Sequence, residues 1–230
     1  MPDAPEPGLA ARLRDGTREA HRAAERGPFI RAFLGARRAG PERPAGPTLD
    51  RATYRAYLIA LHAVYTALEA GLERHREHPV AGPLALPYLY RAPAIAADLR
   101  TLFAADPAAP PPVPAALALA ARLRELADRD PALLVAHAYT RYLGDLSGGQ
   151  ILRGAAARIL GLDADADASH TPGLAFYDFP QIPDLSVCKA DLRARLDALP
   201  LAPAGVNALV AEAREAFARN AAVFADLLPT

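Results

Sequence analysis

The sequence predicts an all-α protein with a single domain, and three observations support this prediction. Apolar residues between positions 54 and 72 recur with the 3.6-residue period of an amphipathic helix. No segment shows the sustained apolar–polar alternation of a β-strand. The 230 residues are 52% hydrophobic, enough for one sizeable core, and the proline-rich stretches are too short to be interdomain linkers. We therefore expect a flexible tail at residues 1–8 and one domain over residues 9–228.

Glycine, proline and short polar residues mark the ends of the expected helices. In chain order, these helices cover residues 9–26, 29–38, 50–79, 115–128, 131–160, 187–199 and 203–228. A Gly-Pro pair closes the first helix, Asp50 or Thr48 caps the third, and Asp130 caps the fifth. Short helices interrupted by prolines are expected at residues 80–103. Irregular chain is expected at residues 40–47, 104–114 and 163–187.

Charge and cysteine content narrow the classes of partner and compartment. The 26 Lys and Arg residues equal the 26 Asp and Glu residues, so nothing indicates a nucleic acid or an anionic membrane as partner. The single cysteine, Cys188, excludes an internal disulfide and fits a reducing compartment. The N-terminus lacks the basic and apolar segments of a signal peptide, and no apolar run approaches the roughly 18 residues of a membrane span. We expect a soluble cytoplasmic monomer without a membrane anchor.

Three glycines surround one carboxylate in the middle of the fifth helix. Gly144 and Gly148 are four residues apart and share a helix face, which Gly149 widens. Each glycine costs the helix about 1 kcal/mol relative to alanine. A face without side chains lets a flat ligand approach the backbone, with Asp145 beside it. Close packing against another helix would also explain the small residues. The third glycine and the carboxylate favour a ligand pocket.

Three other groups of residues have the spacing of a binding site. His21 and Glu25 are at i and i+4, so the imidazole can bind a metal through one nitrogen and donate to the carboxylate through the other. An ordinary surface ion pair is the alternative. Lys189 and Arg193, also i and i+4, can present two cations to one anion or form a solvated helix face. The last helix places three residues on one face, as pocket wall or as core: Phe217, Asn220 and Phe224.

Together these segments resemble the haem oxygenase family. Residues 133–150, LLVAHAYTRYLGDLSGGQ, are similar to the family's distal-helix signature nearly without departure. Residues 14–25 resemble its proximal-histidine helix, residues 173–180, GLAFYDFP, its aromatic turn, and residues 217–224 its final helix. The resemblance spans residues 9–228. It implies a multi-helix fold with haem sandwiched between a proximal helix and a glycine-rich distal helix.

The resemblance also implies a role for each residue that matches the family's motifs. His21 is the expected axial ligand of the haem iron, with Glu25 on its second nitrogen. Gly144 and Gly148 let the distal helix lie over the iron, and Asp145 orders water beside the bound oxygen. Two further residues are expected in the same hydrogen-bond network: Tyr65 and Arg141. The other expected haem contacts are Arg14, Thr17, Arg18, Tyr139, Thr140, Gly149, Lys189, Arg193, Phe217, Asn220 and Phe224.

Among these contacts, Lys189 and Arg193 are expected to bind the haem propionates, and Arg14 stands where relatives often have lysine. The sequence departs from the family pattern elsewhere. The loop at residues 36–47 looks longer than in close relatives, and residues 104–114 are unusually rich in proline. Cys188 is followed by lysine and so does not match the family's Cys-Pro haem-regulatory motif. None of these departures touches the expected site.

The implied reaction cleaves haem b, which is both substrate and cofactor, to biliverdin, carbon monoxide and ferrous iron with O₂. No flavin or nicotinamide motif is visible, so the electrons would come from a ferredoxin or a flavoprotein reductase. A basic stripe on the first helix could dock this acidic electron donor, or it could be an ordinary solvated helix face. It consists of Arg14, Arg18, Arg22 and Arg26. Two alternatives are a haem carrier of the same fold and a related helical protein with di-iron or thiamine-type activity. Di-iron bundles need Glu-x-x-His pairs, and none occurs here. The His cluster at residues 75–78 is expected to be solvated charge at a helix end.

Overall fold

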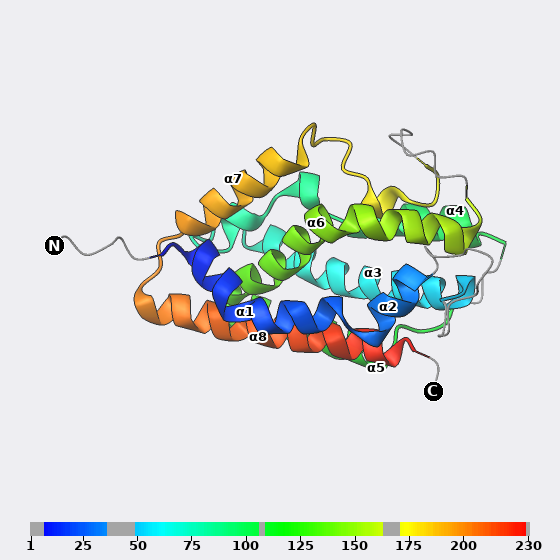
Figure 1. Cartoon of the computed structure of the whole chain (residues 1–230). Helices are drawn as coiled ribbons and strands as arrows, with labels where there is room; N and C mark the ends of the chain where they lie inside the picture. Colours follow the sequence, from blue (N-terminus) through cyan, green and yellow to red (C-terminus); the bar gives the residue numbers. More distant parts are fainter. Residues whose placement is uncertain (1–6, 36–48, 106–108, 163–170, 229–230) are drawn as a thin grey trace.

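The computed structural model describes residues 7–35, 49–105, 109–162 and 171–228, and its regular elements over these ranges are all helical. The all-α prediction is therefore confirmed (Figure 1). The α-helices are α1 (Leu9–Glu25), α2 (Pro28–Gly35), α3 (Arg51–Arg74), α4 (Ala92–Phe103), α5 (Pro114–Arg129), α6 (Leu134–Leu160), α7 (Leu185–Asp197) and α8 (Pro203–Asp226). Short 3₁₀ turns are η2 (Gly82–Leu84), η3 (Pro87–Leu89), η4 (Pro131–Leu133) and η5 (Ala175–Tyr177).

Some sequence predictions fall outside the described residues. These are the tail up to residue 6, the loop at 36–47, Thr48, and parts of the irregular segments at 104–114 and 163–187. Within the described chain, no helix is long and apolar enough to cross a membrane.

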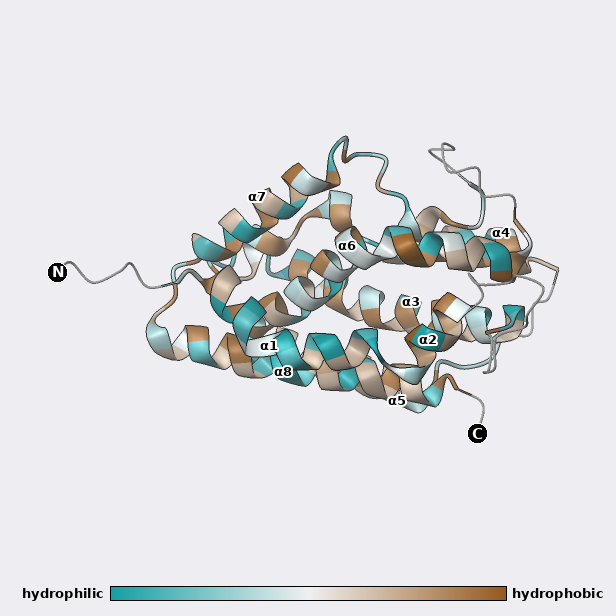
Figure 2. Ribbon diagram, in the orientation of Figure 1, coloured by the Kyte–Doolittle hydropathy of each residue, from teal (hydrophilic) through white to brown (hydrophobic). Residues whose placement is uncertain are grey.

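Helix α3 lies at the centre of the bundle and supplies much of the core. The Asp50 side chain caps it by accepting a hydrogen bond from Thr53 N at 2.7 Å, as predicted. The eight apolar positions that carried the periodicity argument are all buried: Tyr54, Tyr57, Leu58, Leu61, Val64, Tyr65, Leu68 and Leu72. Helix α3 packs against α4, α5 and α6, while α1 lies along α8 (Figure 1). Hydrophilic and hydrophobic residues alternate along α1 and α8, as expected for helices with one buried face (Figure 2).

Several predicted helix boundaries differ from the structure, and three of the differences have a physical reason. Helix α3 ends at Arg74 instead of residue 79, because the chain ahead of Pro79 tightens into turns in which Arg76 N donates to Glu73 O and His78 N to His75 O. Asp130 makes no side-chain cap, since a 3₁₀ turn at Pro131–Leu133 precedes α6. Helix α7 starts at Leu185, two residues earlier than predicted, because Asp184 accepts from Ser186 N and Val187 N and caps it.

The cluster at residues 75–78 was predicted to be solvated charge, which holds for the exposed Arg76 and Glu77 but is wrong for the two histidines, which are half-buried and hydrogen-bonded. His75 Nε2 lies 2.7 Å from the carbonyl oxygen of Ala127, near the end of α5. His78 Nδ1 accepts from the backbone N–H groups of Val80 and Ala81 at 3.2 and 3.1 Å. Both rings therefore satisfy backbone groups where the chain leaves α3.

A buried ionic cluster fastens α6 to its neighbours. His137 on α6 is 1% exposed, and its Nε2 lies 2.9 Å from Oε1 of Glu212 on α8. Arg122 on α5 donates from Nη2 to Glu212 Oε2 at 2.9 Å. Burial raises the pKa of Glu212, but the hydrogen bonds from His137 and Arg122 outweigh it and lower the pKa to about 2. The cluster thereby fixes the helix that carries the glycine strip, the bare face formed by Gly144, Gly148 and Gly149.

The lowered pKa of Glu212 predicts how stability depends on pH. Its stabilisation is fully present above the unfolded pKa near 4.5 and is lost as pH falls toward the folded pKa of about 2. We expect Glu212→Gln to lower the free energy of unfolding by up to about 3 kcal/mol at pH 7, and by much less at pH 3. Urea unfolding at both pH values measures this difference. Glu125→Gln, a more exposed partner of the same Arg122, is the control with a small effect at either pH. A Glu212→Gln effect that is equal at both pH values would contradict the account.

Candidate functional site

A cleft of about 910 Å³ opens between α1 and α6. Helix α1 contributes Arg14, Thr17, Arg18, His21 and Glu25 to its wall. Helix α6 contributes Tyr139, Thr140, Leu143, Gly144, Ser147 and Gly148. Phe217 and Phe224 of α8 close the gap between the two helices. The structure thus brings most of the sequence-predicted site residues around one cavity.

His21 presents its imidazole to the cleft from α1. The side chain is 54% exposed, and its Nδ1 lies 3.5 Å from Glu25 Oε1. Its ring meets Phe217 edge to face, with the ring centroids 5.8 Å apart. Because Nδ1 faces the carboxylate, Nε2 is the nitrogen left for a ligand in the cleft. Among the described residues, no three His, Cys, Asp or Glu side chains gather into a metal site. A metal at His21 must therefore bring its other ligands with it, as the metal of a macrocycle does.

The glycine strip of α6 forms the opposite wall. A Cβ atom added at Gly144 or Gly148 would have open space around it, with no neighbouring heavy atom of the described residues within 4 Å. These glycines therefore do not pack against another helix. Gly149 is different, because its Cβ would lie 3.9 Å from the Tyr177 ring, an ordinary contact. The strip leaves a flat, bare backbone surface across the cleft from His21.

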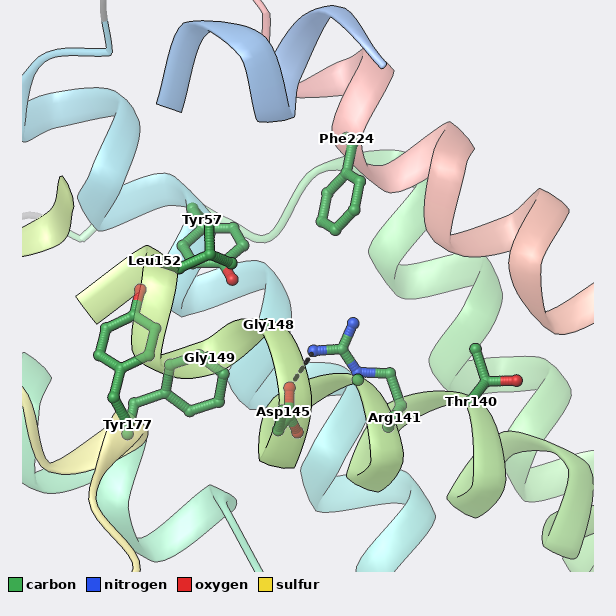
Figure 3. A pocket seen from close by; sticks show the side chains of 11 residues that line it. Tyr57, Thr140, Arg141, Asp145, Gly148, Gly149, Leu152, Tyr177 and Phe224 are labelled. Carbon is green, nitrogen blue, oxygen red and sulfur yellow. Dashed lines mark hydrogen bonds and ion pairs between the residues drawn. The ribbon is translucent and has the colours of Figure 1, made fainter. Parts of the chain in front are cut away.

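Asp145 is held beside the strip by a buried hydrogen-bond network. Tyr65 on α3 donates its hydroxyl proton to Asp145 Oδ2, and Arg141 Nε donates to the Tyr65 hydroxyl oxygen at 2.9 Å. Arg141 Nη2 also donates to Asp145 Oδ1 at 3.4 Å, and Figure 3 shows this pair. Arg141 Nη1 donates to Asn220 Oδ1 at 3.3 Å. Three side chains from three helices thus fix one carboxylate: Tyr65 and Arg141 contact it, and Asn220 accepts from Arg141.

Asn220 corrects a sequence prediction. We expected it to wall the pocket, but it lines neither cavity described here. It is 7% exposed, accepts from Arg141, and donates from Nδ2 to the Ala216 carbonyl oxygen at 2.7 Å. Its carboxamide turns inward because the buried Arg141 needs an acceptor there.

Burial controls the ionisation of this network. It raises the pKa of Asp145, although the charge of Arg141 and the hydrogen bond from Tyr65 act in the opposite direction. Burial also raises the pKa of Tyr65 well above its ordinary value. Burial opposes the charge of Arg141, but Tyr65 and Asp145 outweigh it and raise the pKa of Arg141. Arg141 therefore stays charged, while Asp145 gains a proton more readily than a surface aspartate does.

A second, smaller cavity of about 140 Å³ lies against the same strip (Figure 3). It shares five wall residues with the cleft: Thr140, Gly144, Gly148, Leu152 and Phe224. Arg141 and Asp145 line only this smaller cavity, which we call the inner pocket. The cleft and the inner pocket therefore adjoin at Gly144 and Gly148. The carboxylate of Asp145 lies on the side of the inner pocket.

Of the four basic residues predicted to contact haem, three line the cleft. Arg14 and Arg18 both contact Asp15, at 3.3 and 2.5 Å, and Arg193 of α7 lies on the cleft wall. Lys189 does not line the cleft, so the predicted two-cation clamp is incomplete. Arg193 instead turns back along α7 and donates to the Lys189 carbonyl oxygen at 3.4 Å.

Sequence reasoning missed several wall residues. The cleft also contains Ile30, Leu34, Ile151 and Asp197, and the inner pocket contains Tyr57, Phe176 and Tyr177. Helical spacing could have identified Asp197, which follows Arg193 by four residues, and Leu152, which follows Gly148 by four. The position of Tyr57 at a cavity depends on how α3 packs against α6, and no local pattern reports that packing.

Comparisons with known proteins agree with this architecture. The family model described as "Heme oxygenase" matches residues 7–226. The heme oxygenase of Porphyra purpurea is 36% identical over 225 residues, covering 95% of this chain and 86% of that protein. Heme oxygenase 1 of Synechocystis is 34% identical over 220 residues, covering 95% of this chain and 84% of the relative.

Solved structures give the same result. The crystal structure of Synechocystis heme oxygenase-1 in complex with heme matches with a TM-score of 0.83 and 34% identity, covering 96% of this chain and 92% of that one. Heme oxygenase from Leptospira interrogans matches with a TM-score of 0.81 and 36% identity, covering 95% of this chain and 98% of that one. The fold and its helical order are thus shared with these proteins.

The open space at the strip predicts an unusual stability effect. Gly148→Ala should stabilise the ligand-free protein by up to about 1 kcal/mol, because alanine favours the helix and meets no neighbour. Gly71→Ala on α3 is the matched contrast and should destabilise, since its Cβ would lie 3.1 Å from Leu134 and 3.2 Å from Ala127. Urea unfolding of both variants measures whether the free energy of unfolding rises or falls in each. Destabilisation by Gly148→Ala would show that the strip is a packing surface.

Proposed function

The chain belongs to the haem oxygenase family, and from this premise we propose that it is an enzyme that cleaves haem b to biliverdin, carbon monoxide and ferrous iron. Haem is then both the substrate and the cofactor, and O₂ the oxidant. One observation carries the proposal. An imidazole with a free Nε2 faces a bare helix backbone across a cleft large enough for a macrocycle, and a buried carboxylate lies beside that backbone.

Haem fits the cleft as a flat ligand between α1 and α6. Its iron would take Nε2 of His21, while Glu25 holds Nδ1. Its other face would lie on Gly144 and Gly148, where side chains would exclude O₂. The Synechocystis structure that shares this fold contains heme, which supports the placement.

The cations on the cleft wall would bind the haem propionates. Arg14, Arg18 and Arg193 line the cleft, and guanidinium groups suit carboxylates geometrically. Because the propionates fix the rotation of haem within its plane, these residues would determine which meso carbon is attacked. Lys189 would join them only by extending its side chain toward the cleft.

Asp145 would supply the directed proton chemistry. Bound haem provides the iron that activates O₂, and the protein positions water and protons around it. Asp145 holds water at the strip, and its raised pKa lets the carboxyl group exchange protons closer to neutral pH. Tyr65 and Arg141 keep the carboxylate in one orientation. A haem carrier would not need this network, so the structure favours catalysis over the carrier function.

The electrons would come from a separate redox protein. We propose a ferredoxin or a flavoprotein reductase, with the chain itself a monomer in the cytoplasm. Arg18 and Arg22 on α1 lie at the haem cleft and offer a basic face to an acidic donor.

The direct test adds haem and a reductant to the protein in air. We expect the haem absorption band to be replaced by biliverdin absorption. Haem that binds but stays intact through repeated reduction would support the carrier function instead.

His21 is the first residue to test within this proposal. His21→Ala should lose the six-coordinate ferric haem spectrum and the turnover, because His21 is the only histidine of the described ranges that lines the cleft. Added imidazole should restore part of both. His62→Ala, on α3 away from the cleft, is the control and should keep both. An unchanged spectrum in His21→Ala would assign the iron to another ligand.

Asp145 is the second residue to test within this proposal. Asp145→Ala should bind haem but form biliverdin about 10²- to 10³-fold more slowly, the usual loss when one positioned polar group is removed. Asp145→Asn should be milder, because an amide can still organise water. Asp191→Ala, an exposed residue paired with Arg195 on α7, should be unaffected. Single-turnover absorbance measures the rates, and an unimpaired Asp145→Ala would exclude the carboxylate from the reaction.

A further inference from the structure

Tyr57 carries a hydroxyl group into the inner pocket that the proposed reaction does not yet use. It lies on α3, two helical turns before Tyr65, and is 3% exposed. Its ring packs against Phe29 and Phe33, with the centroids 5.5 Å apart in each pair, and against Phe224 at 6.3 Å. Figure 3 shows the hydroxyl turned into the pocket, on the side of Arg141. The aromatic contacts therefore fix the ring and aim its only polar atom at the network.

The inner pocket has the size and polarity to hold water. Its volume is about 140 Å³, whereas a cavity for one water molecule needs only about 10–15 Å³ of the same measure. An apolar cavity of this size would stay dry. This one has Tyr57, Arg141 and Asp145 on its wall, which supply the two to four polar partners that a buried water molecule needs.

The electrostatics connect Tyr57 to the same two residues. Burial raises the pKa of Tyr57, the charge of Arg141 and the hydroxyl group of Tyr177 lower it, and Asp145 raises it again, with a net upward shift. The phenol therefore stays protonated at working pH and offers one donor and one acceptor throughout. Arg141 donates one N–H each to Tyr65, Asp145 and Asn220, which leaves two of the five N–H donors of its guanidinium for a water molecule that also contacts Tyr57.

We propose that Tyr57 is a positioning residue that holds an ordered water molecule in the inner pocket, together with Arg141 and Asp145. This inference rests on the proposed haem oxygenase reaction and adds a residue to it. Water at Asp145 is then anchored from two sides, by the carboxylate on α6 and by the phenol on α3. Gly144 and Gly148 line both the inner pocket and the cleft, so this water molecule would lie next to the glycine strip.

The test compares Tyr57→Phe with Tyr54→Phe, both as haem complexes. Tyr57→Phe removes only the hydroxyl group and keeps the aromatic packing. Tyr54 is a matched control, because it lies one turn earlier on α3, is 0% exposed and lines neither cavity. Tyr57→Phe should keep the haem affinity and form biliverdin about fivefold to tenfold more slowly, the effect of losing one hydrogen bond. Tyr54→Phe should match the unmodified protein in both.

A spectroscopic readout separates positioning from a structural role. The pH midpoint between the acid and alkaline spectra of the ferric complex reports hydrogen bonding around the iron-bound water. It should rise by roughly half to one pH unit in Tyr57→Phe, and stay unchanged in Tyr54→Phe. Unchanged rate and midpoint in Tyr57→Phe, with active unmodified protein, would overturn the role of Tyr57 alone. Unmodified protein that leaves haem intact would overturn the proposed function instead.

Discussion

The site depends on one constraint, that helix α6 must be bare on the face toward the cleft and polar just beside it. A flat ligand can reach the helix backbone only where side chains are missing, and Gly144 and Gly148 leave that space open. In the proposed reaction, the carboxylate that acts on the ligand comes from the adjoining inner pocket, where Asp145 is buried. Burial alone would favour the neutral form of Asp145. Tyr65 and Arg141 therefore both stabilise its charged form and hold the side chain in place.

The rest of the bundle compensates for this arrangement. The two cleft glycines lower the intrinsic stability of α6 by about 2 kcal/mol together. The cluster of His137, Arg122 and Glu212 ties the same helix to α5 and α8 one turn before the network begins. Arg141 and Asn220 make a second link between α6 and α8. Helix α6 is thus held by buried polar contacts from its neighbours, and its open face can remain free for a ligand.

The sequence was sufficient for the features that follow from local periodicity. The buried face of α3, the pairing of His21 with Glu25 and the strip on α6 all depend on residues three or four apart, and the structure has each of them. The roles of these residues toward haem remain proposals.

Features set by contacts between helices were not predictable in the same way. Asn220 turns inward because of Arg141 on another helix, and Lys189 misses the cleft because of how α7 lies over α1. Tyr57 looked like an ordinary core residue, and only the packing of α3 against α6 places its hydroxyl group at a cavity.

The most direct measurement is a haem titration of Gly148→Leu, followed by absorbance. Gly154→Leu is the matched control, since Gly154 lies on the same helix, also has open space at its Cβ, and lines neither cavity. If the ligand lies on the bare strip, Gly148→Leu should weaken haem binding by roughly 10- to 100-fold and Gly154→Leu should leave it unchanged. Equal haem affinity in the two variants, both folded, would contradict the account.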